Sequence, residues 1–243
     1  MPSLFLSLVI PAYNEERRLP HTLEQVALFL ESQSYSWEVI VVDNASSDKT
    51  PDIIRDFAQR HPQIRGLHEK RRGKGEAVKS GMLAAKGEYR FMCDADLSMP
   101  ITELNRFLPP QLENFDLAIA SREAQGATRH NEPFYRHLGG RAINTLIRLL
   151  ILPGLNDTQC GFKCFSAAAT EDLFNHQTLS SWSFDIEILA IAQLRGYKIA
   201  EIPISWHFEP GSKLNAFRSA VQMFLDILTV RDNARKGVYA KKD

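Results

Sequence analysis

The chain alternates short apolar segments rich in branched residues with amphipathic segments of helical spacing, and this alternation constrains the fold more than any other feature. Branched apolar runs favour buried strands, and apolar residues that recur every three to four positions favour helices. Strands are predicted at residues 4–10, 37–42, 64–68, 89–93, 116–120 and 199–204. Helices are predicted at residues 22–32, 51–60, 75–85, 101–108, 135–152, 184–194 and 216–233. Repeated strand–helix units predict an α/β fold with a mostly parallel sheet covered on both faces.

The 243 residues show no internal repeat, low-complexity tract or linker, so we predict a single domain over residues 1–243. Lys and Arg together number 29, as do Asp and Glu, which leaves a formal net charge of zero. A neutral chain argues against a nucleic-acid-binding protein with a basic surface. Three cysteines are too few for a disulfide framework, and no secretory signal or membrane-spanning apolar run is present. We therefore expect a protein of the reducing cytosol.

Polar side chains follow three of the predicted strands. They occupy residues 11–16, 43–48 and 94–96, each directly after an apolar run. In parallel α/β sheets, ligands bind beyond the carboxyl ends of the strands. The three segments are therefore expected to contribute to one ligand site.

Asp94 and Asp96 are two residues apart, so in extended backbone both side chains point the same way. Two carboxylates held together repel unless a cation lies between or beside them. Oxygen ligands favour a hard divalent ion, Mg²⁺ or Mn²⁺, shared with substrate phosphates. Taken alone, however, such a pair is more often a solvated turn or a helix cap than a metal site.

Four motifs taken together resemble the inverting family-2 glycosyltransferases, which have the GT-A fold. The motifs are Pro-Ala-Tyr-Asn-Glu at 11–15, Val-Val-Asp-Asn-Ala-Ser-Ser-Asp at 41–48, Gly-Lys-Gly at 73–75 and Asp-Ala-Asp at 94–96. As a set, in this order and spacing, they are specific to that family. The resemblance implies a nucleotide-sugar and metal half in about residues 1–125 and an acceptor half in about residues 126–243.

The resemblance also implies roles for the matching residues. The nucleotide-sugar site is expected to contain Pro11, Ala12, Tyr13, Asn14, Glu15, Asp43, Lys74, Asp94 and Ala95. Asp94 and Asp96 are expected to bind the metal and the donor diphosphate, with Ser98 as a further ligand. Two alternatives are a core aromatic role for Tyr13 and an Asx-turn formed by Asp43 before Ser46.

The basic segment at 70–75 separates into two parts. Glycines flank Lys74 and a helix begins next, which suits contact with a phosphate. Lys70 and Arg71 are more typical of a solvated loop. We therefore expect only Lys74 to contact the donor.

Later motifs resemble the branch that transfers sugars to polyprenyl phosphates, above all the dolichyl-phosphate β-glucosyltransferases. They lie at residues 121–122, 134–136, 157–163, 180–187 and 206–214. Independently, residues 121–150 contain five Arg against two Glu, and the guanidinium fork is suited to phosphate oxygens. Arg122, Arg136 and Lys213 are the residues expected to hold the acceptor phosphate.

The implied reaction is attack of a polyprenyl monophosphate oxygen on the anomeric carbon of a nucleotide sugar, with inversion. A phosphate monoester has a second pKa of about 6, so the nucleophile is largely ionised at neutral pH and needs no strong base. Asp96, Arg122 and Asp185 are the expected catalytic groups, although Asp185 and Glu187 are more typical of structural or orienting residues. UDP-glucose is preferred to GDP-mannose as the donor.

The predicted helix at 135–152 is amphipathic, and its apolar face fits either the core or a bilayer interface. We expect peripheral contact with the cytosolic face of a membrane. Two other functions stay open. One is a soluble glycosyltransferase with a non-lipid acceptor, and the other is a nucleotide-binding partner subunit without enzyme activity.

Overall fold

The computed structural model describes residues 4–208 and 216–240, and it gives only the backbone of residues 134–138, 142 and 216–220. The strands are β1 (Leu6–Ala12), β2 (Trp37–Asp43), β3 (Ile64–His68), β4 (Tyr89–Cys93), β5 (Leu117–Ser121), β6 (Thr128–His130), β7 (Phe162–Ser166), β8 (Ile199–Pro203) and β9 (Ser205–His207). The helices are α1 (Leu19–Glu31), α2 (Thr50–Arg60), α3 (Lys74–Ala84), the 3-10 helix η1 (Ile101–Phe107), α4 (Phe134–Leu150), α5 (Ala167–His176), α6 (Phe184–Leu194) and α7 (Ala216–Arg235). Each predicted strand and helix has a counterpart among these elements.

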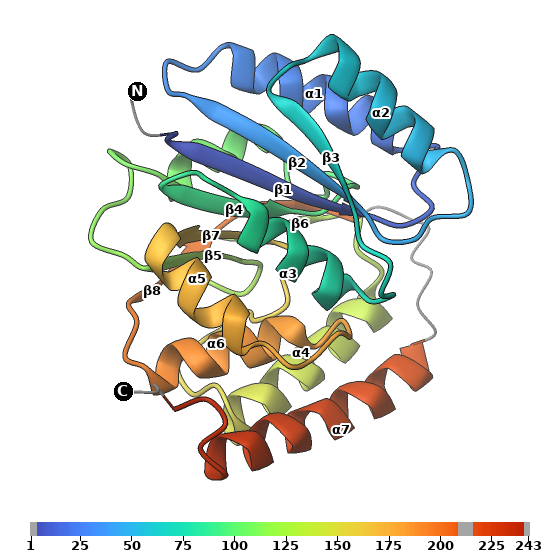
Figure 1. The fold of residues 1–243 in the computed structure, drawn as a ribbon. Coiled ribbons are helices and arrows are strands. Elements are labelled where there is room, and N and C mark those ends of the chain that lie inside the picture. Colours follow the sequence, from blue (N-terminus) through green and yellow to red (C-terminus); the bar gives the residue numbers. More distant parts are fainter. Residues whose placement is uncertain (1–3, 209–215, 241–243) are drawn as a thin grey trace.

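Seven strands form one sheet in the order β3-β2-β1-β4-β7-β5-β8 (Figure 1). Neighbouring strands are parallel except at β7, which runs antiparallel to both β4 and β5. The expected mostly parallel α/β sheet is therefore confirmed. β6 and β9 pair with each other as a separate two-stranded parallel sheet.

Helices cover both faces of the large sheet (Figure 1). On one face, α1, α2 and η1 bury residues such as Leu23 and Phe57 against the strands. On the other face, α3, α5 and α6 bury residues such as Val78 and Leu173 in a second cluster. α4 and α7 complete this second layer, and α4 contributes Ile147 to the same cluster. Burying apolar side chains on both faces explains why the strand sequences are nearly continuous apolar runs.

Two sequence predictions need correction. The first strand was expected to end before Pro11, but β1 continues through Pro11 to Ala12. The strand tolerates proline here because pairing with β4 stops at Val9, so Pro11 is opposite a partner only on the β2 side. The segment 101–108, expected to be a helix, is a 3-10 helix over Ile101–Phe107.

The sequence patterns did not predict β6, β7, α5 or β9. Of these, β7 matters most for the site because it lies inside the sheet and runs opposite to its neighbours. Its first residue, Phe162, pairs with Cys93, the last residue of β4. The segment that precedes β7 therefore reaches the same sheet edge as the segment that follows β4.

Candidate active site

The loops that follow β1 and β2 are joined by side-chain hydrogen bonds. The backbone N–H of Ser47 donates to Oδ1 of Asn14 over 2.8 Å, and the N–H of Glu15 donates to Oγ1 of Thr50 over 2.8 Å. Asn14 has a φ of +53°, a left-handed conformation that asparagine adopts more readily than most residues. The predicted site residue Asn14 thus shapes the loop, and Tyr13 beside it is 38% exposed. That exposure excludes a core aromatic role for Tyr13.

Asp43, the last residue of β2, is buried and uses both carboxylate oxygens within the protein. Oδ1 accepts a hydrogen bond from the N–H of Ser46, three residues on, over 3.1 Å, so the side chain stabilises this turn locally although an Asx-turn would bond the residue two positions on. Oδ2 lies 2.7 Å from Nδ1 of His68, at the end of β3. Asp43 is therefore fixed in place at the sheet edge, where its contact with a base stays a prediction.

The loop that carries Lys74 is held on both sides. Oδ1 of Asn44 accepts a hydrogen bond from the N–H of Gly73 over 2.9 Å. The N–H of Gly75 donates to the carbonyl of Ser180 over 3.0 Å. Gly73 has a φ of +137°, and a Cβ there would lie 2.2 Å from the Ser180 carbonyl oxygen. Only glycine allows this close approach of the two loops.

Lys74 reaches across the site to Asp94. Its Nζ lies 2.6 Å from Oδ1 of Asp94 and 4.8 Å from the ring centroid of Trp182. Burial disfavours the charged amine, but Asp94 and then Asp185 outweigh it and raise the pKa of Lys74. The lysine therefore places a permanent positive charge beside the first carboxylate of the Asp94–Asp96 pair.

The segment that follows β4 holds three predicted metal ligands. Oδ1 of Asp96 accepts a hydrogen bond from the N–H of Ser98 over 3.0 Å. The N–H of Asp94 donates to the carbonyl of Gly161 over 3.2 Å, and a Cβ on Gly161 would lie 1.9 Å from Oδ2 of Asp94. Ala95 is buried, and its carbonyl accepts a hydrogen bond from the Thr22 hydroxyl. The loop before β7 thus packs directly against the carboxylate of Asp94.

The side chains of Asp94, Asp96 and Ser98 fit a hard divalent ion that the protein and a substrate bind together. Within residues 4–208 and 216–240, no cluster of three or more His, Cys, Asp or Glu side chains could hold a metal ion by itself. The carboxylates of Asp94 and Asp96 and the hydroxyl of Ser98 offer only oxygen. Mg²⁺ commonly binds through one or two carboxylates together with substrate phosphates. The residues present therefore suit Mg²⁺ or Mn²⁺ bound together with a diphosphate.

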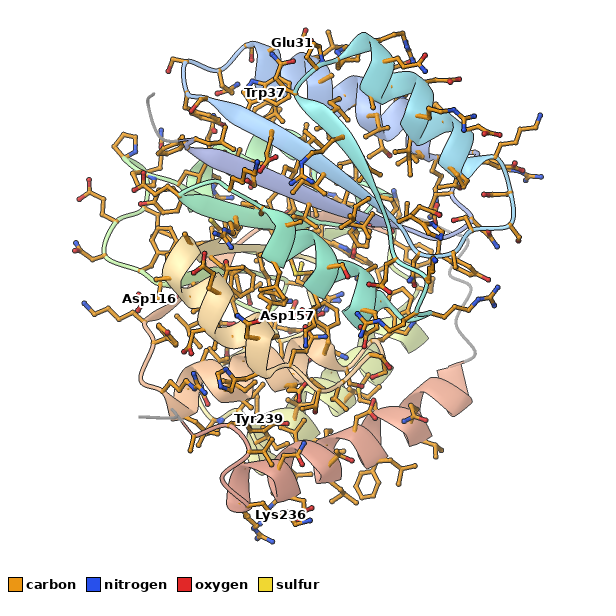
Figure 2. All side chains as sticks on the ribbon, viewed as in Figure 1. Glu31, Trp37, Asp116, Asp157, Lys236 and Tyr239 are labelled. Carbon is orange, nitrogen blue, oxygen red and sulfur yellow. The ribbon has the colours of Figure 1, made fainter. Side chains whose placement is uncertain are left out.

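Arg122, directly after β5, forms a bidentate ion pair with Asp157. Nε of Arg122 lies 2.6 Å from Oδ2 and Nη2 lies 2.9 Å from Oδ1 of Asp157, whose side chain is fully buried. Figure 2 labels Asp157. Burial would raise the pKa of Asp157, but Arg122 outweighs it and lowers that pKa to about 2. The guanidinium of Arg122 also lies 5.5 Å from the ring centroid of Trp206.

A second buried pair joins Lys163 of β7 to Asp185 of α6. Nζ of Lys163 lies 2.8 Å from Oδ1 of Asp185. Burial raises the pKa of Asp185 above its ordinary value, and Lys163 and Lys74 only partly counter that effect. Glu187 is also buried and accepts hydrogen bonds from Thr178 and from the hydroxyl of Tyr239. These contacts are those of structural or orienting groups.

Residues 7–174 match the sequence profile described as Glycosyl transferase family 2. The match covers more than half of the chain and contains all three loops at the strand ends. The chain belongs to this family.

This family-2 glycosyltransferase is similar over nearly its whole length to proteins named dolichyl-phosphate beta-glucosyltransferase. It is 34% identical over 253 residues to that of Trichomonas vaginalis named ALG5C, covering 99% of this chain and 74% of the relative. It is 34% identical over 245 residues to the Homo sapiens enzyme, covering 95% of this chain and 76% of the relative.

Among solved structures, the glycosyltransferase is similar to glucosyl-3-phosphoglycerate synthase from Mycobacterium tuberculosis in complex with UDP. The TM-score is 0.68 at 19% identity, covering 93% of this chain and 79% of that chain. A complex of the same synthase with Mn²⁺ and UDP-glucose gives a TM-score of 0.66 at 18% identity, covering 93% and 78%. At these identities the likeness shows the fold, and it agrees with the expected GT-A architecture.

The structure brings together most of the residues that the sequence of this glycosyltransferase singled out. Lys74, Asp94 and the loop of Asp96 and Ser98 converge at one sheet edge, together with the loops that follow β1 and β2. Lys213 lies outside the described residues, and so does the side chain of Arg136. Asp157, Gly161, Lys163 and Trp182 were not singled out as site residues, although all four fall within motifs quoted from the sequence.

Two further features bear on the acceptor side. Among the described residues, no helix has both the length and the apolar character needed to cross a membrane. Several large apolar side chains of α7 are nevertheless exposed, namely Val221, Phe224, Leu225 and Leu228. Leu149 of α4 is 80% exposed.

Proposed function

We propose that this glycosyltransferase transfers glucose from UDP-glucose to a polyprenyl monophosphate such as dolichyl phosphate, with inversion at the anomeric carbon. The donor half of this proposal rests on one contact. Nζ of Lys74 and Oδ1 of Asp94 come from separate segments and lie 2.6 Å apart at the carboxyl ends of the strands. Such an arrangement suits a metal-bound diphosphate. The names of the relatives support glucose and the lipid acceptor.

On this proposal, Asp94, Asp96 and Ser98 hold Mg²⁺ or Mn²⁺, which neutralises negative charge on the departing nucleoside diphosphate. Lys74 contributes a second positive charge from the opposite loop. The ion pair with Asp94 already places the Lys74 amine beside the carboxylate pair where the diphosphate would bind. Tyr13 and Asp43 border the nucleotide base and ribose on the far side of the site.

The acceptor needs no strong general base because its phosphate is already largely ionised at neutral pH. Asp185 is buried and paired with Lys163, so we assign it an orienting role beside Lys74. Arg122 is anchored by Asp157 at the end of β5, where its positive charge supports an acceptor phosphate held by Arg136 and Lys213. The exposed apolar residues of α7 and Leu149 support peripheral contact with a bilayer that supplies the lipid.

Label transfer tests the proposal. The purified chain is incubated with radiolabelled UDP-glucose, Mn²⁺ or Mg²⁺, and polyprenyl phosphate, and label is measured in the organic phase. We expect transfer that EDTA abolishes and that Asp96→Ala reduces at least about a thousandfold. The matched control is Asp52→Ala, which removes an exposed carboxylate on α2.

Three results would contradict the proposal. Transfer of label only to water-soluble acceptors would favour a soluble glycosyltransferase with a non-lipid acceptor. A clear preference for GDP-mannose under the same conditions would replace the proposed donor. Binding of a sugar nucleotide without transfer to any acceptor would favour the non-enzymatic alternative, a nucleotide-binding partner subunit.

A further inference from the structure

His68 and Asp43 form a hydrogen-bonded pair at the carboxyl ends of two neighbouring strands. They are register partners at the last residues of β3 and β2, and Ala12, the last residue of β1, is the next partner in the same row. Nδ1 of His68 lies 2.7 Å from Oδ2 of Asp43. Two strand spacings, about 10 Å, separate His68 from the end of β1, which Tyr13 follows. The pair therefore borders the region where the proposed function places the nucleotide base.

The segment that begins at His68 is held in place and returns to Tyr13. The side-chain amide of Asn44 donates to the carbonyl of Arg71 over 2.7 Å. The guanidinium of the next residue, Arg72, lies 5.5 Å from the centroid of the Tyr13 ring. Residues 68–72 therefore form one side of the region beside Tyr13, and His68 stands at its base on the end of β3.

Of the two members of the pair, the histidine is the one open to solvent. The side chain of Asp43 is 5% exposed, and its two oxygens are used by Ser46 and by His68. The side chain of His68 is 56% exposed, and within the described part of the chain its ring makes no hydrogen bond other than the one with Asp43. A ligand at this end of the sheet therefore meets the imidazole of His68 before it meets the Asp43 carboxylate.

Asp43 also determines which ring nitrogen of His68 carries the proton. A carboxylate only accepts hydrogen bonds, so Nδ1 of a neutral imidazole must donate to it. Nε2 is then left without a proton and can only accept a hydrogen bond. The pair thus presents one acceptor of fixed polarity at the end of β3.

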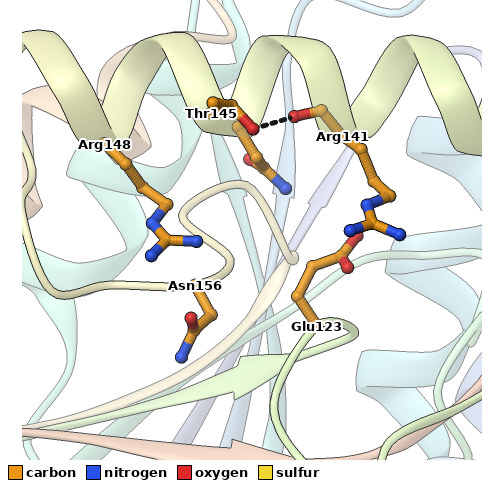
Figure 3. Close-up of a pocket in the computed structure, with 6 residues that line it drawn as sticks. Glu123, Arg141, Thr145, Arg148 and Asn156 are labelled. Atoms are coloured by element: carbon orange, nitrogen blue, oxygen red, sulfur yellow. Dashed lines mark hydrogen bonds between the residues drawn. The ribbon is translucent and has the colours of Figure 1, made fainter.

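A polar pocket of about 130 Å³ at another part of the sheet edge is too far away to take part. Figure 3 shows Arg141 and Arg148 reaching from α4 toward Glu123 and Asn156 across this pocket. Glu123 lies two residues past β5, which is four strand spacings, about 20 Å, from β2 and Asp43. The pocket is therefore separate from the region around the base.

We infer, on the basis of the proposed function, that Nε2 of His68 selects the base of the donor nucleotide. It accepts a hydrogen bond from N3–H of uracil, and it rejects cytosine because N3 of cytosine carries no proton. Proteins commonly read a base through hydrogen bonds to this edge. A bound cytosine would bring two acceptors together with no proton between them, and each would lose its hydrogen bond to water. Asp43 acts on the base through His68, as a positioning residue.

Calorimetric titration of the full chain with UDP and with CDP tests this selection without any transfer reaction. Both nucleotides are added with Mg²⁺ at about pH 8, where an ordinary histidine is neutral. We expect the wild type to bind UDP at least about tenfold more tightly than CDP, the effect of one matched hydrogen bond.

His68→Gln is the decisive variant because its amide can turn to present either an oxygen or an NH₂ group. It should bind UDP and CDP within about twofold of each other, with CDP bound more tightly than in the wild type. A merely structural role for His68 would weaken both nucleotides alike. His21→Gln, on an exposed position of α1, is the matched control and should keep the wild-type preference for UDP.

Long-range ¹H–¹⁵N spectra of the histidine rings give a second measurement on the wild-type chain. The His68 signals are those that His68→Gln lacks. We expect the proton on Nδ1, and we expect the Nε2 signal to move on addition of UDP and much less on addition of CDP at the same concentration.

Three results would overturn the inference. An unchanged preference for UDP in His68→Gln would show that another group reads the base, and it would leave the proposed donor intact. A proton on Nε2 in the wild type at about pH 8 would exclude this nitrogen as the acceptor. Equal binding of UDP and CDP by the wild type, or binding of neither, would count against the proposed uridine donor as well.

Discussion

Individual side chains in this protein act in pairs that join distant parts of the sequence. Arg122 and Asp157 are 35 residues apart, and they form one buried bidentate contact beside the acceptor side of the site. Removing one member of a buried pair leaves the other charge without compensation, which costs far more than the pair itself contributes. The pair of Asp52 and Arg55 on α2 is exposed to water, so removing one of its members should cost little.

Asp157→Asn should therefore lower the free energy of unfolding by about 3–5 kcal/mol. Asp52→Asn, which breaks a solvent-exposed pair, should change it by less than about 1 kcal/mol. Urea denaturation monitored by circular dichroism measures both. Similar small effects of the two substitutions would show that the Arg122–Asp157 pair is not important for stability.

The same pair predicts how stability depends on pH. Arg122 lowers the pKa of Asp157 to about 2, below its ordinary value of 3.8. Because the folded state binds this proton less readily than the unfolded state, the contribution is full above about pH 5 and is lost as pH falls toward 2. Its size is about 2 kcal/mol. Urea midpoints measured between pH 6 and pH 2 should fall less steeply in Asp157→Asn than in the wild type, and parallel curves would contradict the assignment.

Lys70 lies in the loop before α3 and Lys74 is the first residue of α3, and the two lysines differ in surroundings. Lys74 is largely buried against Asp94 and Trp182, whereas Lys70 is exposed. Lys74→Met should weaken UDP binding in the presence of Mn²⁺ by about tenfold or more, because a charge-assisted contact to the diphosphate is lost. Lys70→Met is the matched control, with an expected change below about twofold. Isothermal titration calorimetry measures both, and equal losses would indicate a diffuse charge effect.

At the scale of elements, the apolar patterns of the sequence predict every strand of the large sheet except β7, and they predict the long helices. β7 escaped prediction because Lys163 interrupts its apolar run, and only the structure reveals that Asp185 of α6 neutralises this buried lysine. α5 begins directly after β7, with the Ser166 side chain capping its first turn, so no loop separates the two patterns. A cap followed by three alanines was the available signal for that helix.

Gly161, which directly precedes β7, leaves no room for a side chain beside Asp94. A Cβ on Gly161 would lie 1.9 Å from Oδ2 of Asp94, and Gly161→Ala should therefore displace that carboxylate. We expect Mn²⁺-dependent UDP binding to weaken at least about tenfold. Gly139→Ala on α4 meets nothing within 4 Å and should stabilise the helix by about 0.5–1 kcal/mol without changing UDP binding. Unchanged binding in Gly161→Ala would show that the Asp94 loop adapts.

At the scale of the whole molecule, the segment after α7 is tied to the loop that packs on Lys74. The hydroxyl of Tyr239 donates to Glu187 over 2.7 Å, and Glu187 also accepts from the N–H groups of Thr178 and Leu179 (Figure 2 labels Tyr239). Leu179 precedes Ser180, whose carbonyl accepts the N–H of Gly75. One buried carboxylate therefore connects the segment after α7 with the segment that carries Gly73, Lys74 and Gly75.

Tyr239→Phe removes one hydrogen bond from this buried carboxylate. It should lower the free energy of unfolding by about 1.5–3 kcal/mol, the range for hydrogen bonds to charged groups. Val238→Ala, next to it but with an exposed side chain, should change it by less than about 1 kcal/mol. Chemical denaturation of both variants measures the difference, and a loss in Val238→Ala as large as in Tyr239→Phe would argue against a specific role for the hydroxyl.

The candidate site was predictable from the sequence only where its residues follow strands. The segments that contain Tyr13, Asp43 and Asp94 each follow an apolar run, so their common sheet edge follows from the topology of parallel strands. Contacts between segments far apart in the chain leave no local pattern. The Lys74–Asp94 contact and the Arg122–Asp157 pair therefore emerged only from the structure.

Because β7 lies between β4 and β5, the chain cannot be cut near residue 125 without removing a central strand of the sheet. β4 and β5 belong to the half that would bind the donor, but the strand between them comes from the other half. A fragment of residues 1–125 would leave the backbone of both β4 and β5 unpaired in the middle of its sheet, and exposed edges of this kind promote aggregation. We expect that fragment to be insoluble alone and to become soluble when residues 126–243 are produced with it. The part of the chain expected to bind the donor and the part expected to bind the acceptor therefore share one sheet and depend on each other for folding.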